Sequence, residues 1–121
     1  MTAVMRMGVV ALAAAVLGAE ALAQDIPRGD AANGKRIYLA VGCFTCHGRS
    51  GQGGAYTGPA PILAHMALPF EGFKALIRAP SGNMPAYSDA VLSDKDIVDI
   101  YAFLQSLPGP RSPKGISILN N

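Results

Sequence analysis

The stretch Cys43-Phe44-Thr45-Cys46-His47 places two thiols and one imidazole next to one another in the chain. The cysteines are three positions apart, and the histidine follows the second cysteine directly. This spacing is the attachment signature of a c-type haem, whose porphyrin bonds to both thiols while the imidazole binds its iron. The pentapeptide therefore predicts one covalent haem c, with Cys43 and Cys46 as the thioether residues and His47 as the proximal iron ligand.

Three other chemistries also use paired cysteines. A structural zinc ion usually takes four Cys or His ligands, and His65, the other histidine, lies outside the usual finger spacing from His47. A redox dithiol is expected within a βαβ pattern, and no strand pattern accompanies this motif. A plain disulfide, in a binding module without haem, explains the cysteines but not the adjacent histidine. Haem attachment accounts for all three residues.

The N-terminus has the pattern of a secretory signal peptide over residues 1–23. Arg6 precedes an apolar run at 7–19, and Ala-Leu-Ala at 21–23 matches a cleavage site. The apolar run is shorter than the ~20 residues that span a bilayer, so we expect cleavage rather than stable membrane insertion, with an uncleaved anchor as the alternative. Haem attachment of this kind takes place outside the bacterial cytoplasm. The sequence thus predicts a periplasmic protein.

The charge and composition of the whole chain narrow the class of protein. The formal net charge is +2 and no run of like charges occurs, so nothing indicates nucleic-acid binding. With 14 glycines and 9 prolines, the chain is rich in loops for its size. Small loop-rich chains rarely bury enough apolar area alone, so we expect the porphyrin to supply part of the core and the apoprotein to fold poorly. The expected domain is 24–110, followed by a tail at 111–121.

Apolar residues at helical spacing predict three main helices and an all-α fold with long loops. The first helix is expected from the N-cap Asp30 to about Val41, and the second over 69–79. The third begins with a capping-box pattern at Ser93 and Asp96 and ends before 108–110. The expected buried faces comprise Gly34, Ile37, Tyr38 and Val41; Phe70, Phe73, Leu76 and Ile77; and Ile97, Ile100, Tyr101 and Leu104.

The sixth iron ligand separates an electron carrier from a haem that binds small molecules. Met84 lies in a loop between two expected helices, and Pro85 stiffens that loop. Met66 lies in an apolar stretch where a methionine usually fills the core. His65 would give bis-histidine coordination. Met84 is the predicted distal ligand, and a thioether there raises the reduction potential.

The order of these features resembles a mono-haem class I cytochrome c of the bacterial, periplasmic type. The resemblance covers about residues 30–107, and its other motifs are Met84-Pro85-Ala86-Tyr87 and the final helix with Tyr101. It implies a cytochrome c fold, with helices wrapped around one covalent haem.

The resemblance also implies two contacts. The first and last helices should cross through a glycine–aromatic contact, which maps onto Gly34 or Tyr38 against Tyr101. A proline carbonyl should accept the imidazole N–H of the proximal histidine, and both Pro59 and Pro61 fit that place. Arg78, Tyr56 and Tyr87 are candidate partners of the haem propionates, with an exposed arginine and half-buried tyrosines as the alternative interpretation.

The expected function is one-electron transfer in the periplasm by a carrier that is not an enzyme. Its partners would be a periplasmic dehydrogenase or a terminal oxidase. One alternative is a cytochrome subunit of a periplasmic dehydrogenase complex, attached through the tail after Pro108. Another is a catalytic or gas-sensing haem with an open sixth position.

Overall fold

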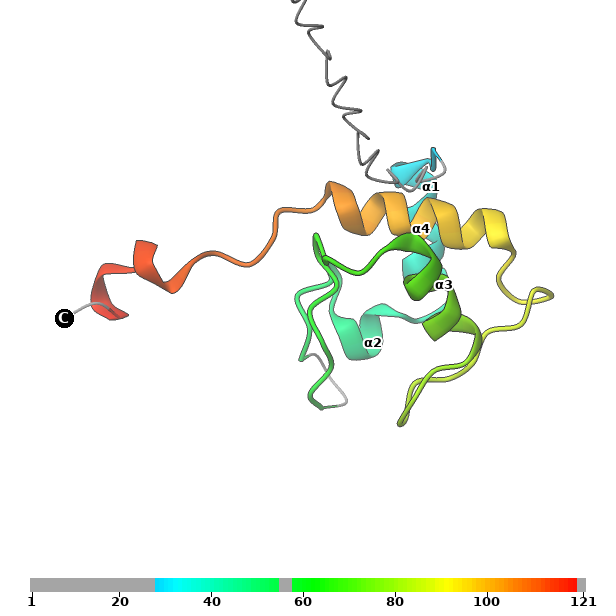
Figure 1. Cartoon of the computed structure of the whole chain (residues 1–121), viewed down its shortest axis with the longest axis horizontal. Helices are drawn as coiled ribbons and strands as arrows, with labels where there is room; N and C mark the ends of the chain where they lie inside the picture. Colours follow the sequence, from blue (N-terminus) through cyan, green and yellow to red (C-terminus); the bar gives the residue numbers. More distant parts are fainter. Residues whose placement is uncertain (1–27, 55–57, 120–121) are drawn as a thin grey trace, which may run out of the picture.

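The computed structural model describes residues 28–54 and 58–119, and in these ranges all regular structure is helical. The predicted signal peptide at 1–23 and the candidate propionate partner Tyr56 lie outside the described residues. Figure 1 shows the arrangement. The elements are α1 (Ala31–Ala40), α2 (Phe44–His47), α3 (Phe70–Arg78), α4 (Asp94–Ser106) and two 3-10 turns, η1 (Pro113–Gly115) and η2 (Ser117–Leu119).

The all-α prediction is confirmed, and capping explains where the two longest helices begin. The side chain of Asp30 accepts hydrogen bonds from the backbone N–H groups of Ala32 and Asn33, which starts α1. At α4, Ser93 and Asp96 form the reciprocal capping box that the sequence predicted. The short helix α2, which contains the cysteine motif, was not predicted as a separate element.

Helices α1 and α4 cross at Gly34. A Cβ atom at this position would lie 1.9 Å from the backbone oxygen of Asp99, so only glycine allows this approach. Beside it, the rings of Tyr38 and Phe103 pack with centroids 5.5 Å apart. The expected aromatic partner, Tyr101, instead packs against α3.

Tyr101 joins α4 to α3 rather than to α1. Its ring centroid lies 5.5 Å from that of Phe70 and 5.3 Å from that of Phe73. Its hydroxyl donates a hydrogen bond of 2.8 Å to the Leu68 carbonyl, just before α3. The glycine–aromatic crossing therefore uses Tyr38 and Phe103, whereas Tyr101 anchors the third helix.

A buried carboxylate reinforces the α1–α4 crossing. Asp99 accepts hydrogen bonds from the Asp30 backbone N–H at 2.8 Å, the Asn33 side-chain amide at 2.8 Å and Lys95 Nζ at 2.7 Å. Burial alone would raise the pKa of Asp99, but these bonds outweigh it and hold the pKa at about 2. Asp99 thus links the start of α1 to the middle of α4 as a carboxylate.

Helices α1 and α3 pack against α4, and α2 and the loops beside α3 extend below α4 in Figure 1. The tail after α4 runs away from this body and exposes Ile116, Ile118 and Leu119. Within 28–54 and 58–119, no helix has the length and apolarity needed to cross a bilayer.

Candidate functional site

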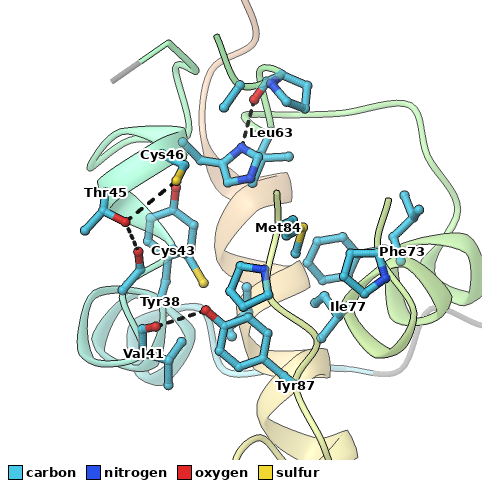
Figure 2. A pocket seen from close by; sticks show the side chains of 18 of the residues that line it. Tyr38, Val41, Cys43, Thr45, Cys46, Leu63, Phe73, Ile77, Met84 and Tyr87 are labelled. Atoms are coloured by element: carbon cyan, nitrogen blue, oxygen red, sulfur yellow. Dashed lines mark hydrogen bonds between the residues drawn. The ribbon is translucent and has the colours of Figure 1, made fainter. Parts of the chain in front are cut away.

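A cavity of about 960 Å³ lies between the cysteine motif, α3 and the loop that carries Met84. Its volume is at the upper end of the range of about 300–1,000 Å³ for ligand pockets. Aliphatic and aromatic side chains dominate its walls, and no Lys, Arg, Asp or Glu is among the described residues that line it. Figure 2 shows the cavity with its thiols and thioether. The site is therefore suited to a large, mainly apolar ligand.

The two cysteines share one face of the turn formed by α2 and its N-cap. Cys43 has helical backbone angles, so Cys46 follows it one turn later on the same side. Both line the cavity, and neither forms a disulfide in the structure. Gly42, with φ of +84°, makes the sharp bend between α1 and α2 that aims this turn at the cavity.

Burial raises the pKa of the Cys43 thiol to about 11, and the neighbouring Cys46 adds to the rise. A redox dithiol needs a lowered pKa to supply its thiolate, so this environment does not favour that alternative. The described residues also contain no group of three or more His, Cys, Asp or Glu side chains that could hold a metal ion. The zinc interpretation therefore has no structural support.

His47 is buried, with 8% of its surface exposed, and its ring is held by one defined contact. Nδ1 lies 3.0 Å from the carbonyl oxygen of Pro61. Because a carbonyl oxygen can only accept, Nδ1 donates this hydrogen bond. Of the two proline candidates, the structure therefore selects Pro61 over Pro59. The contact orients the ring and leaves Nε2 as the nitrogen available to bind iron.

The backbone around His47 is fixed from two sides. The buried hydroxyl of Tyr38 on α1 donates a hydrogen bond of 2.7 Å to the Gly48 carbonyl, and burial raises the pKa of this phenol. The His47 carbonyl accepts a hydrogen bond of 2.8 Å from the Gly53 N–H. These bonds hold the end of α2 in place beneath the loop that supplies Pro61.

Met84 lies across the cavity from Cys43 and Cys46, next to Phe73 and Ile77 of α3 (Figure 2). Its side chain is half-buried and packs against the core. This position suits a ligand that approaches the iron from the face opposite the cysteine motif. The ligand roles of His47 and Met84 remain predictions.

The two alternatives to Met84 differ in where they lie. His65 is exposed and does not line the cavity; its ring Nδ1 lies 3.1 Å from the Gln105 carbonyl oxygen, at the end of α4. Bis-histidine coordination therefore does not fit this structure. Met66 does line the cavity, and its carbonyl accepts a hydrogen bond from the Gln105 side chain at 2.8 Å. Met66 is the remaining competitor of Met84.

Two of the candidate propionate partners, Arg78 and Tyr87, make hydrogen bonds to backbone carbonyls. Arg78 does not line the cavity: its guanidinium donates to the carbonyls of Tyr87 and Leu92 and pairs with two carboxylates. Tyr87 does line the cavity, but its hydroxyl donates to the Val41 carbonyl at 3.1 Å (Figure 2). Arg78 as a propionate partner stays a prediction, and the contacts it makes here could not be read from its position in the sequence.

A comparison with known protein families finds a match. A family model described as cytochrome c oxidase, cbb3-type, subunit III matches residues 29–104. This chain belongs to that family of c-type cytochromes. The match begins just before α1 and ends within α4, so it includes the cysteine motif, the cavity and the Met84 loop.

Two curated relatives carry the name cytochrome bc1 complex cytochrome c subunit. The protein from Corynebacterium efficiens is 38% identical over 80 residues, covering 64% of this chain and 26% of its own length. That from Corynebacterium diphtheriae is 35% identical over 83 residues, covering 67% of this chain and 28% of its own. This cytochrome spans about a quarter of the length of these relatives. No solved structure matches the chain significantly.

The family establishes the general role. This cytochrome is a haem electron carrier and not an enzyme, as the sequence predicted. Its residues fit the haem that the family implies: two thiols on one helical face, an oriented imidazole and a thioether all line one apolar cavity.

Proposed function

We propose that this cytochrome passes single electrons between respiratory proteins of the periplasm through one covalent haem c ligated by His47 and Met84. The observation that carries the proposal is the His47–Pro61 hydrogen bond in a cavity that also receives both thiols and Met84. Bound haem supplies an iron that one electron from a donor reduces and an acceptor reoxidises.

The residues of the chain have distinct parts in this function. Cys43 and Cys46 would hold the haem through thioether bonds to its two vinyl groups. His47 presents Nε2, and Pro61 keeps the other nitrogen protonated. Met84 supplies a thioether, which favours ferrous iron and raises the potential. The apolar walls would exclude water from bound haem and lower the dielectric constant around it.

The ligand assignment is tested by absorption spectra and potentials of the wild type, Met84→Ala and the matched control Met66→Leu. We expect wild-type Soret absorption to survive acid–acetone extraction, because the haem is covalent. Met84→Ala should lose the weak red charge-transfer band of sulfur-ligated ferric iron, and its potential should fall by about 100 mV or more, within the ~0.8 V that axial ligands span. Met66→Leu should keep both.

Other outcomes identify the alternatives. If Met84→Ala keeps the band and Met66→Leu loses it, Met66 is the ligand. Rapid carbon monoxide binding by ferrous wild type at neutral pH would indicate an open sixth position and contradict the proposed electron carrier. Extraction of the Soret absorption by acid–acetone would contradict covalent attachment.

Export to the periplasm is proposed from the pattern of residues 1–23. Cell fractionation and the intact mass of the purified protein test it. The expected result is a periplasmic protein whose first residue is Gln24. A cytoplasmic protein, or a membrane protein that retains residues 1–23, would contradict the proposal.

A second candidate is a tightly held subunit of a respiratory complex. It is favoured by the relatives' names and by the tail, which extends from the body with Ile118 and Leu119 exposed by 78% and 63%. Gel filtration of a native extract distinguishes the two roles. A free carrier should elute near its own mass, whereas a subunit should elute with its complex and lose that position when residues 111–121 are deleted.

A further inference from the structure

The loop of residues 79–93, between α3 and α4, carries the proposed sixth ligand and has no helix of its own. Loops of this length without secondary structure are uncommon in compact domains and usually have a function. A thioether is a neutral and comparatively weak ligand, so it stays on the iron only while its loop remains closed. The contacts that hold this loop therefore bear directly on ligation.

One arginine connects the loop to both flanking helices. From the last turn of α3, Arg78 Nη1 donates hydrogen bonds of 2.9 Å to the Tyr87 carbonyl and 2.7 Å to the Leu92 carbonyl. Its Nη2 pairs with Asp94 at 2.7 Å, at the start of α4, and also with Asp89. The guanidinium thus contacts the loop at two backbone positions and the next helix at its first residue.

Tyr87 transmits this restraint toward Met84, which precedes it by three positions. Its N–H donates to the Ile77 carbonyl at 3.0 Å, and its own carbonyl accepts from Arg78. Its hydroxyl reaches the Val41 carbonyl at 3.1 Å, close to the cysteine motif. The chain directly after Met84 and Pro85 is therefore held on one side by α3 and on the other by the end of α1.

We propose that Arg78 is a positioning residue for the sixth iron ligand, which keeps the Met84 loop closed against the cavity. The inference rests on the proposed His47–Met84 ligation. It follows from the shape of the guanidinium, because a planar fork can serve two carbonyls and two carboxylates at once, whereas a lysine ammonium cannot. The side chain is only 22% exposed, so water replaces these bonds poorly when they are lost.

The test compares holoproteins of the wild type, Arg78→Lys, Asp89→Asn and Lys74→Met. Arg78→Lys keeps the positive charge but loses the planar guanidinium and its several N–H donors. Lys74→Met is the matched control, because Lys74 also lies on α3 and pairs with the same Asp94, whereas the loop carbonyls of Tyr87 and Leu92 accept from Arg78. The measurements are the red charge-transfer band, the reduction potential and the rate at which ferrous protein binds carbon monoxide.

Arg78→Lys should bind carbon monoxide about tenfold faster or more, as expected when a hydrogen bond from a charged group is lost, with a weaker band and a lower potential. Asp89→Asn should shift all three in the same direction by less, because Asp89 is exposed. Lys74→Met should behave as wild type. A merely structural role would lower the melting temperature without changing ligand access.

Wild-type spectra, potentials and carbon monoxide rates in both Arg78→Lys and Asp89→Asn would overturn the inference. If Arg78→Lys does not retain haem, the Asp89→Asn variant alone decides: unchanged spectra, potential and carbon monoxide rate in that variant would overturn the inference. Met84→Ala, measured alongside, keeps the two proposals distinct. If Met84→Ala keeps the band, the ligand assignment has failed; if it loses the band while the loop variants do not change, only the role of Arg78 has failed.

Discussion

At the scale of single residues, the distance to neighbouring backbone and the direction of hydrogen bonds determine which side chain a position tolerates. Gly34 has no room for a Cβ atom against the α4 backbone, and Pro61 offers only a carbonyl to the imidazole of His47. Neither restriction depends on the residue alone. Each arises because a distant segment lies within contact distance.

Gly34→Ala should destabilise the holoprotein by about 3 kcal/mol or more, because the new methyl group meets backbone rather than a movable side chain. Gly115→Ala is the control: it adds the same group in the tail, where nothing lies within 4 Å. Urea unfolding followed by far-UV circular dichroism measures both variants. Equal unfolding free energies would show that α1 and α4 do not cross at Gly34.

At the scale of elements, α1 and α4 are joined by a buried charge as well as by apolar packing. Asp99 is 1% exposed and accepts hydrogen bonds from two positions at the start of α1. Its lowered pKa means that the folded state prefers the carboxylate form more strongly than the unfolded state does. The stabilisation is therefore complete above the ordinary pKa of aspartic acid and is lost as the pH falls from about 4 to about 2.

Asp99→Asn should lower stability at pH 7 by about 2 kcal/mol, because an amide nitrogen cannot accept from Asn33 or Lys95. The difference from wild type should shrink as the pH falls toward 2, where the native carboxylate is itself protonated. Lys95→Met, which removes only an exposed partner, should cost less than about 1 kcal/mol. Denaturant unfolding of the three holoproteins between pH 7 and pH 2 measures this, and a constant difference would contradict it.

At the scale of the whole molecule, the helices enclose a space that their own side chains do not fill. Leu76 illustrates this: it belongs to the predicted buried face of α3, yet it is 45% exposed and borders the cavity. An apolar cavity of about 960 Å³ is costly in a domain whose net stability is of the order of 5–15 kcal/mol. The haem is therefore expected to serve as core and as redox centre.

A Cys43→Ala, Cys46→Ala double variant, which cannot hold haem covalently, should lose its cooperative thermal unfolding and its near-UV circular dichroism. The single variant Cys46→Ala, with one thioether possible, should lie between it and the wild type. Calorimetry and circular dichroism of the purified proteins measure these differences. A haem-free double variant that melts cooperatively near the wild-type temperature would show that the polypeptide supplies its own core.

The sequence alone determined the features whose signals are local. The cysteine motif, the N-caps at Asp30 and Ser93 and the apolar spacing of the helices all depend on residues a few positions apart, which is why the helices begin where they were predicted. It also placed Met84 in a loop between two helices. From these local signals the sequence also predicted the family and the electron-transfer function.

Only the tertiary structure decided which distant groups meet. It selected Pro61 over Pro59, placed His65 outside the cavity, turned Tyr101 toward α3 and brought Arg78 against the Met84 loop. Each of these contacts joins residues that no short pattern relates, and each depends on the angle at which α1, α3 and α4 pack. The physical reason is that the spacing of apolar residues indicates which face of a helix is buried, but not which other element packs against that face.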